Sequence, residues 1–325
     1  MLIPHQHLHL IPLSALPIGN NQHLGDKYPI RTLASCQVLS FGQNRDRLST
    51  APTYGIVENT KLDLPFSSLE AEKVAQLYQV KPDKRLKGKE ATPVKYRELL
   101  QQVKRVLSSH HAVSRIDDNL ESALILADEQ KITLGELLTP AYRFPELDEV
   151  FLSCCETNVG VAKPTDDILT LNTGFLSAGA QGVISTLWEV DDLAACVFSI
   201  IYHELRAEGI DRVVAVQKAQ QTIRNMTKKQ LKQEYKKSLE EMLEPKLRAA
   251  SKLVRALETQ KSSYVEGSPE YKSWQKKLEK AINDYNGVTK DKINLESRLQ
   301  NAYKLKYPFA HPVYWSSFIC AGLRD

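Results

Sequence analysis

The sequence predicts an α/β fold in which helices cover both faces of a mostly parallel sheet, with a long helical hairpin inserted near its end. Short apolar runs alternate with amphipathic segments over most of the chain, a pattern typical of parallel sheets. Residues 228–306 differ, because they are rich in Lys and Glu and contain glycine only at Gly267 and Gly287. Apolar and aromatic residues return at 307–325. We therefore expect one α/β domain over 1–227, completed by a final strand within 307–325, with a helical insertion at 228–306.

The strands are predicted from short runs of β-branched and other apolar residues bounded by turn residues. The runs expected to form strands are 31–41, 54–57, 103–108, 123–126, 149–153, 182–188 and 311–322. Because strands and helices alternate along the chain, neighbouring strands should run parallel and present their carboxyl ends at one edge of the sheet.

The helices are predicted from apolar periodicity together with start and stop signals. Thr92 precedes Pro93, which suits an N-cap followed by the first helical position. Gly179 provides a stop. The segments expected to form helices are 67–78, 92–102, 133–138, 167–179, 193–207 and 212–226.

The insertion carries two apolar stripes at helical spacing, separated by the turn Gly267-Ser268-Pro269-Glu270. This turn combines a helix breaker, an N-cap and a proline at the first helical position. A kink is expected at Pro245. Two helices of about 30 residues would each extend about 45 Å. One interpretation is that the two helices pack on each other and expose their charged faces. The alternative is that they form a docking arm for a substrate or partner.

Composition excludes several classes of protein. The net charge of +4 gives no electrostatic support for nucleic-acid binding. No apolar run approaches the roughly 18 residues needed to cross a membrane. The apolar start of the chain lacks the basic region and cleavage site of a signal peptide, so a cytoplasmic location is expected.

Cysteine usage and the lack of nucleotide motifs narrow the chemistry further. The five cysteines form no CxxC or CxxH pair, which argues against disulfides and structural zinc. No P-loop, GxGxxG or GxSxG motif is present, so no cofactor and no serine nucleophile is expected.

Two strand ends carry nucleophilic or basic side chains. FLSCCETN (151–158) places Cys154 and Cys155 where an apolar run stops, and KRVLSSHHA (104–112) does the same with His110 and His111. Successive strand residues face opposite ways, so one cysteine should pack while the other faces a cleft. A thiol with an imidazole in reach is the arrangement that nucleophilic catalysis needs. Buried structural cysteines and surface histidines are the other interpretation.

Several segments resemble the CHAT family, the caspase-like peptidase domains named for their association with HetF and with TPR repeats, in the clan of caspases and separases. The matching segments, in order, are LHLIPLSALP, LEAEKVAQLY with GKEATPVKY, VLSSHHA, FLSCCETNVG, GFLSAGAQGVISTLWEVDD and HPVYWSSFICAGL. They cover nearly everything outside 228–306. The resemblance implies a caspase-like three-layer αβα sandwich.

The same resemblance implies roles for individual residues. Cys155 stands at the nucleophile, immediately before Glu156-Thr157, and His110 stands at the general base. His111 occupies the position of the family's usual Gly, so His111 is the alternative candidate for the base. The backbone N–H groups of His111 and Cys155 would form the oxyanion hole.

The acidic pair Asp191 and Asp192 is expected to shape substrate preference. In the related separases an acid at this point receives a basic side chain, and Asp192 aligns best with it. A carboxylate there would favour Arg over Lys through bidentate bonds. The simpler interpretation is an N-cap for the helix that begins at Leu193; both roles can hold, with one Asp for each.

Two further groups have simpler interpretations. Asp166 and Asp167 precede a predicted helix, where capping is favoured. His5, His7 and His9 would share one face of a strand and could bind zinc, but no carboxylate or thiol accompanies them, so no metal site is predicted.

The sequence thus predicts a cysteine endopeptidase that cleaves a protein substrate after a basic residue, Arg in preference, through a Cys–His dyad. The alternative is an inactive caspase-like scaffold, motivated by the doubled histidine and the long insertion. A small-ligand domain with Cys155 merely buried is a second alternative. Upstream repeats or a regulatory protein are expected as further partners, without nucleic acid or membrane.

Overall fold

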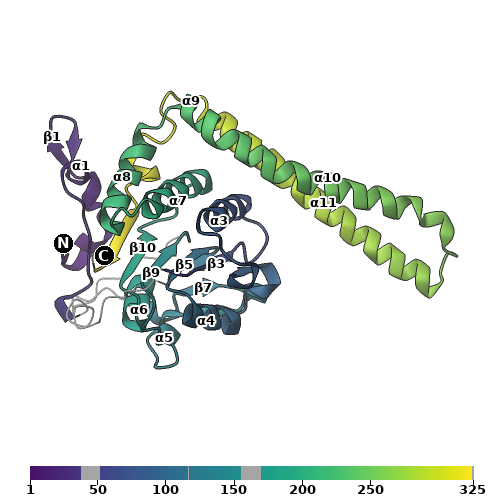
Figure 1. Cartoon of the computed structure of the whole chain (residues 1–325), viewed down its shortest axis with the longest axis horizontal. Helices are drawn as coiled ribbons and strands as arrows, with labels where there is room; N and C mark the ends of the chain where they lie inside the picture. The colour runs from purple at the N-terminus through teal and green to yellow at the C-terminus, as the bar shows by residue number, and fades with distance from the viewer. Residues whose placement is uncertain (38–51, 116, 155–169, 324–325) are drawn as a thin grey trace. The chain divides into compact units, whose positions relative to one another are not determined.

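The computed structural model describes residues 1–37, 52–115, 117–154 and 170–323. The chain divides into two compact units, Met1–Met226 with Phe309–Asp325, and Thr227–Pro308. The first unit is an α/β domain and the second is a helical hairpin (Figure 1).

The centre of the first unit is a mostly parallel sheet, which confirms the predicted fold class. Within the described residues six strands pair in the order β11-β10-β9-β5-β3-β4. They are β3 (Tyr54–Glu58), β4 (Arg85–Lys87), β5 (Arg105–Ser109), β9 (Glu149–Leu152), β10 (Gly182–Thr186) and β11 (Phe318–Gly322). Every pairing is parallel except that of β10 with β11, which is antiparallel.

Helices cover both faces of this sheet. In Figure 1, α3, α7 and α8 lie on one side and α4, α5 and α6 on the other. Their bounds are α3 (Pro65–Tyr78), α4 (Pro93–Gln102), α5 (Leu134–Leu137), α6 (Leu171–Ala178), α7 (Asp192–Ala207) and α8 (Arg212–Asn225). The domain therefore has three layers, helix on sheet on helix, as expected.

Alternation along the strands explains why both faces are covered. Val106 and Val150 join the apolar cluster beneath α4, α5 and α6. The next residue of β9, Phe151, faces the other way and contacts Tyr202 of α7, with ring centroids 5.0 Å apart. Strands buried on both faces are continuous apolar runs, which is what the sequence showed.

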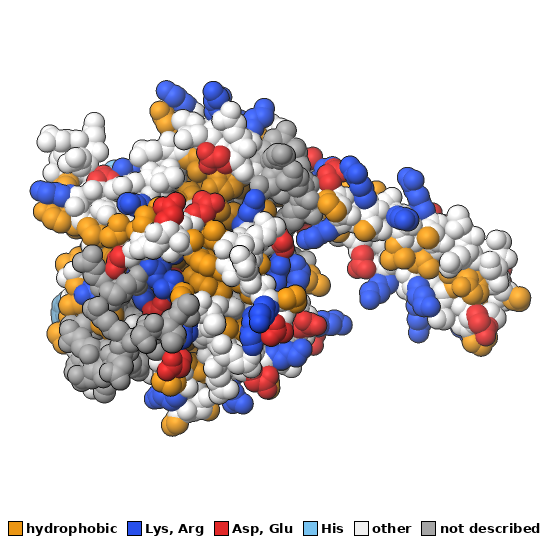
Figure 2. Space-filling model, viewed as in Figure 1, with side chains coloured by type: hydrophobic (Ala, Val, Ile, Leu, Met, Phe, Trp, Pro, Cys, Tyr) orange, Lys and Arg blue, Asp and Glu red, His pale blue; other side chains and the backbone are white. Residues whose placement is uncertain are grey.

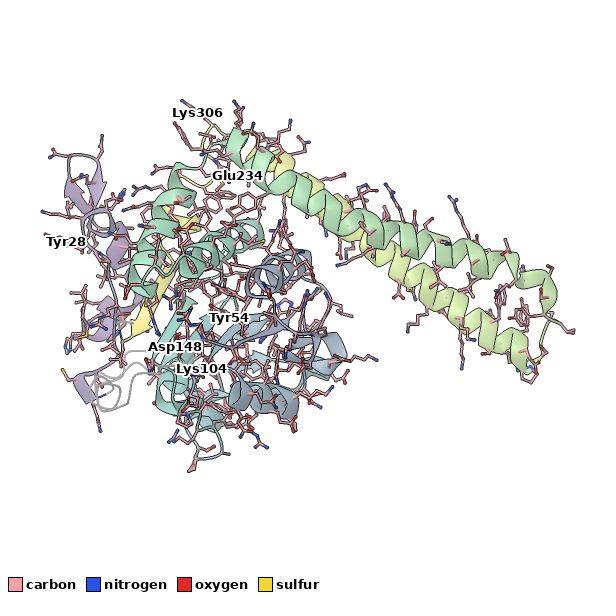
Figure 3. The ribbon with its side chains drawn as sticks, viewed as in Figure 1. Tyr28, Tyr54, Lys104, Asp148, Glu234 and Lys306 are labelled. Carbon is pink, nitrogen blue, oxygen red and sulfur yellow. The ribbon has the colours of Figure 1, made fainter. Side chains whose placement is uncertain are left out.

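Strands β5 and β9 begin together and end within one residue of each other. Their register pairs Arg105 with Glu149 and Ser108 with Leu152. At the amino end, the Lys104 carbonyl accepts the Asp148 N–H at 2.7 Å, and Figure 3 labels these two residues close together. The segments that follow β5 and β9 therefore leave the sheet side by side at its other edge.

Smaller elements complete the domain. A short antiparallel sheet contains β6 (Ala112–Val113), β7 (Ala123–Ile125) and β8 (Lys131–Thr133). Near the start of the chain, β1 (Pro17–Gly19) pairs with β2 (Gln22–His23), and α1 spans Leu24–Lys27.

The first 37 residues depart from the prediction. Gln6–Leu10 forms a 3-10 helix instead of a strand, closed by the Ile11 N–H bonding to the Leu8 carbonyl. The shared strand face that a zinc site at His5, His7 and His9 would need is therefore not formed. The strand expected at 31–41 is reduced, within the described part, to isolated bridges of Thr32 with Leu2 and Ala321. Thr32 reaches β11 only at that point, so no continuous ladder forms.

The last strand is also shorter than predicted. Pro312–Tyr314 forms a 3-10 turn, and β11 begins only at Phe318. Phe318 stacks on Phe198 of α7, with centroids 3.6 Å apart. Pro312 lacks a backbone N–H and fixes its φ angle, which suits the turn and delays the strand.

The second unit confirms the helical hairpin. Its helices are α9 (Lys228–Leu231), α10 (Lys237–Thr259) and α11 (Pro269–Ala302). Trp274 is buried and donates from its indole to the Leu257 carbonyl at 2.8 Å. Lys292 and Glu244 form an ion pair at 2.7 Å. Figure 2 shows Lys and Arg side chains projecting along its surface.

Two details of the hairpin differ from expectation or refine it. Helix α10 continues through Pro245, and the kink expected there stays a prediction. Ala281 is buried, whereas its neighbour Ile282 is 36% exposed.

No helix in the described ranges combines the length and hydrophobicity that a membrane crossing would require.

Candidate active site

His110 follows β5 directly and lies at the carboxyl edge of the sheet. The parallel register brings the residues after β5 and β9 together, and the Ser153 N–H bonds to the Ser108 carbonyl at 2.9 Å. Ligands of open α/β sheets bind beyond this edge. The position predicted for the general base is therefore beside the segment that leads into Cys155.

Burial and two hydrogen bonds determine the protonation of His110. Its side chain is almost fully buried, at 1% exposure. Nδ1 lies 2.9 Å from the His111 carbonyl oxygen, which can only accept, so Nδ1 carries the proton. Nε2 then accepts from the Ser108 hydroxyl at 2.7 Å. Burial lowers the pKa of His110 to about 4, so the imidazole is neutral at pH 7.

His111 has a different environment from its neighbour. Its Nε2 lies 2.9 Å from a carboxylate oxygen of Asp63, and its side chain is 31% exposed. Its backbone carbonyl accepts the Ile125 N–H at 2.9 Å. Of the two histidines, only His110 lines the pocket at this edge of the sheet.

Cys155, the predicted nucleophile, lies outside the described residues, as do Asp166 and Asp167. Its neighbour Cys154 is described and is 3% exposed. The Cys154 thiol donates to the Ser108 carbonyl at 3.2 Å. Cys154 thus behaves as the packing member of the pair.

A pocket opens at this edge between α3 and α7. Its described lining combines His110 with apolar side chains of α3, α7 and β11 and with two carboxyl groups, those of Glu70 and Asp192. Asp192 is half-buried and is the first residue of α7.

The acid that caps α7 is Asp191, not Asp192. One oxygen of the Asp191 carboxylate accepts the N–H groups of Leu193 at 3.1 Å and Ala194 at 3.2 Å. The helix begins one residue earlier than predicted, which moves the capping position back by one. Each of the two acids therefore fills one of the expected roles: Asp191 caps the helix, and Asp192 lines the pocket.

Glu70 was not identified from the sequence. It is 1% exposed and accepts a hydrogen bond from the Ser109 hydroxyl at 2.6 Å. Burial raises the pKa of Glu70 to about 7. One signal was available: Phe66, Glu70 and Val74 are four residues apart, so an acid stands on the buried stripe of its helix.

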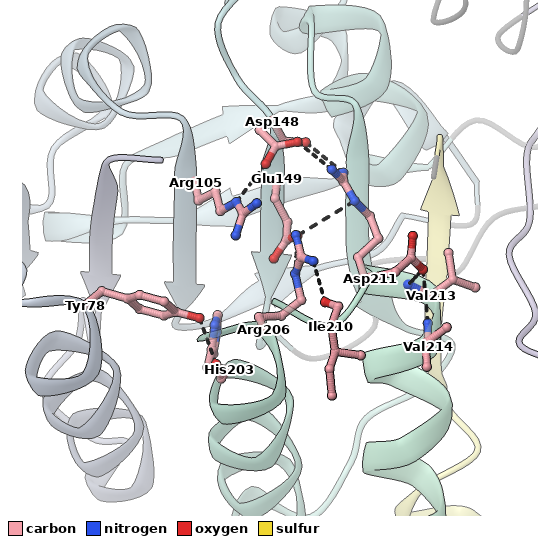
Figure 4. Close-up of polar contacts among 11 residues, drawn as sticks. Tyr78, Arg105, Asp148, Glu149, His203, Arg206, Ile210, Asp211, Val213 and Val214 are labelled. Carbon is pink, nitrogen blue, oxygen red and sulfur yellow. Dashed lines mark hydrogen bonds and ion pairs between the residues drawn. The ribbon is translucent and has the colours of Figure 1, made fainter. Parts of the chain in front are cut away.

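A second buried charge cluster lies at the opposite, amino end of the strands (Figure 4). Arg105 Nε bonds to Asp148 at 2.7 Å, and Arg206 bonds to Glu149 at 2.8 Å. Arg212 donates to the Asp148 carbonyl at 2.9 Å. These contacts tie α7 and α8 to the sheet, so we assign the cluster to stability.

Comparisons with solved structures find weak overall similarity to two peptidase complexes. A separase–securin complex of Saccharomyces cerevisiae matches with a TM-score of 0.48 and 17% identity, over 66% of this chain and 13% of the separase chain. RgpB of Porphyromonas gingivalis, in a complex of its pro- and mature domains, matches with a TM-score of 0.36 and 11% identity, over 67% of this chain and 49% of that chain. The chain thus spans a small part of the first relative and about half of the second.

Sequence comparison gives the family. A search of curated proteins finds no match. The CHAT domain, in contrast, matches residues 1–323, which is nearly the whole chain. The chain belongs to the CHAT domain family.

Proposed function

We propose that this chain is a cysteine endopeptidase in which Cys155 is the nucleophile and His110 is the general base and acid. The observation that carries the proposal is the β5–β9 register, which brings His110 to the same sheet edge as Ser153 and Cys154. Cys155 is the next residue along the chain.

The chemistry is acyl transfer. The Cys155 thiol gives its proton to the neutral imidazole of His110, and the sulfur attacks the carbonyl carbon of the scissile peptide bond. Backbone N–H groups of His111 and Cys155 stabilise the oxyanion; one such donor is typically worth about 3 to 4 kcal/mol. His110 protonates the leaving amine, and water then hydrolyses the acyl-enzyme.

Asp192 gives the proposed preference for a basic residue before the cut. It lines the pocket beside His110. A guanidinium can bind a carboxylate through two parallel N–H bonds, whereas an ammonium cannot. Arg is therefore the preferred residue.

The proposal is tested by labelling and cleavage. A peptide chloromethyl ketone ending in Arg should alkylate Cys155, located by mass spectrometry, in both the wild-type protein and the matched control Cys154→Ala. Cleavage of a peptide library should disappear in Cys155→Ala. His110→Ala should lose at least about 100-fold in kcat/KM, since general acid–base catalysis contributes about that much or more. His111→Ala should lose far less, because its backbone N–H remains.

One observation favours the alternative of an inactive scaffold. His110 is 1% exposed, and both of its ring nitrogens are already hydrogen-bonded to the described residues. If Cys155→Ala changes the cleavage of no library peptide and the chloromethyl ketone does not label Cys155, the peptidase proposal fails and the inactive scaffold is adopted in its place.

A further inference from the structure

Glu70 is a buried acid for which the proposed dyad has no use. It projects from α3 into the pocket that also contains His110 and Asp192. Its Oε2 accepts the Ser109 hydroxyl at 2.6 Å. Its Oε1 is buried and makes no hydrogen bond of ordinary geometry among the described residues, although the Ser153 and Ser199 hydroxyls lie near enough to lower the pKa of Glu70. A buried carboxylate oxygen without a donor is costly, so this oxygen marks a place where a ligand can donate.

The surroundings of Glu70 favour a cation as that ligand. The walls contributed by Phe66, Val190 and Phe318 are apolar, and no Lys or Arg is found in the described part of the lining. Polar and titratable groups surround Glu70 on each element packed against it. They are Glu58 of β3, Ser109 of β5 with His110 after it, Ser153 and Cys154 after β9, and Asp192, Cys196 and Ser199 of α7. None of these groups supplies a positive charge at pH 7, because burial keeps the His110 pKa near 4.

We infer that Glu70 is a second specificity-determining carboxylate, which together with Asp192 receives the guanidinium group of the substrate residue before the cut. This inference rests on the proposed function, because it assigns the pocket to the side chain next to the scissile bond. A guanidinium has five N–H donors in one plane, enough to serve two carboxylates, whereas an ammonium has three. Two acids therefore discriminate for Arg more strongly than one.

Binding of a cation should also change the protonation of Glu70. Burial raises its pKa to about 7, so Glu70 changes its protonation near neutral pH. A bound guanidinium favours the ionised form and releases a proton. The preference for Arg over a neutral isostere should therefore rise between pH 6 and pH 8. Protonation of His110 affects both substrates equally and cancels from their ratio.

The competing explanation is that Glu70 only holds Ser109, and with it the backbone before His110. The two roles separate in Glu70→Gln, because a glutamine oxygen still accepts the Ser109 hydroxyl but carries no charge. If Glu70 only holds Ser109, Glu70→Gln should change the selectivity for Arg little and Ser109→Ala should change it more. If Glu70 determines specificity, Glu70→Gln should change the selectivity more than Ser109→Ala does.

The kinetic test compares two peptides that differ only in Arg or citrulline before the cut. Glu70→Gln should lower the ratio of their kcat/KM values by about 10- to 100-fold, the usual range for a hydrogen bond to a charged group. Glu72→Gln is the matched control on the same helix; its side chain is 44% exposed and pairs with Arg85, and its ratio should match the wild type. An unchanged ratio in Glu70→Gln overturns the inference and leaves the peptidase proposal intact.

A binding test does not depend on catalysis or on the folding of a Glu70 variant. Benzamidine is titrated calorimetrically into the Cys155→Ala chain at pH 7 and pH 9, in buffers of different ionisation enthalpy. Binding should release protons at pH 7 and fewer at pH 9, where Glu70 is already ionised. Binding without proton release at pH 7, or no binding, overturns the inference, whether or not the chain cleaves peptides.

Discussion

The burial of Glu70 predicts a pH-dependent gain in stability for Glu70→Gln. The carboxyl group has a pKa of about 7 in the folded chain and about 4.5 when unfolded. Between these values the unfolded chain loses its proton first, so the free energy of unfolding falls as pH rises. The difference of about 2.5 pH units, at about 1.4 kcal/mol each, amounts to about 3 kcal/mol. Glutamine resembles the protonated acid and does not incur this cost.

We therefore expect Glu70→Gln to be more stable than the wild type by about 3 kcal/mol at pH 8 and by about 1 kcal/mol at pH 5. Urea titrations followed by tryptophan fluorescence at both pH values measure the two differences. Other titrating groups contribute equally to both proteins and cancel. Glu72→Gln should show no such dependence on pH. A stability difference that is the same at pH 5 and pH 8 would refute the claim that a desolvated carboxyl group lies in this pocket.

Three further predictions concern the rest of the α/β domain. Arg212→Ala should lower the free energy of unfolding by about 3 to 5 kcal/mol in urea titrations, because Arg212 is 1% exposed and its loss leaves the Asp148 carboxylate partly unpaired. The control is Arg248→Ala, in which the Arg248 side chain is 81% exposed, and it should cost below about 0.5 kcal/mol. His203→Phe should make the fold less sensitive to acid. Burial lowers the pKa of His203 to about 3, so below about pH 6.5 only the unfolded chain is protonated at this residue, which costs the wild type about 2 kcal/mol of stability at pH 5. Equal losses of stability in both proteins between pH 7 and pH 5 would contradict this. Asp211→Ala should cost about 1 kcal/mol, since its carboxylate caps α8 through the Val213 N–H at 2.9 Å; thermal unfolding measures it, and an unchanged midpoint would mean that the cap contributes nothing.

The proposed site was found from the sequence because its signals are local. An apolar run that stops at Ser-Ser-His-His can be seen without any knowledge of the fold, and so can one that stops at Ser-Cys-Cys. The step from these runs to a shared edge needed only the rule that alternating strands and helices form parallel sheets. The β5–β9 register bears out that step.

Other features depended on contacts between distant parts of the chain. Glu70 lies in a segment that has an ordinary helix pattern, and only the packing of α3 against the sheet and α7 buries it beside Ser109, 39 residues away. The contrast between a buried His110 and a half-exposed His111 likewise requires the pocket on one side and Asp63 on the other. The strand expected at His5, His7 and His9 did not form, because Gln6–Leu10 closes local hydrogen bonds of a 3-10 helix, such as that from the Ile11 N–H to the Leu8 carbonyl.

The sequence by itself determined the strand–helix order, several caps such as Thr92, the helical hairpin and the two strand ends that are followed by His110 and by Cys154. These features depend on backbone hydrogen bonds within a few residues and on the periodic burial of apolar side chains. The tertiary structure alone decided which polar side chains lose contact with water, and so which acid and which histidine line the pocket. Desolvation depends on every element packed around a group, and no short segment of sequence contains that information.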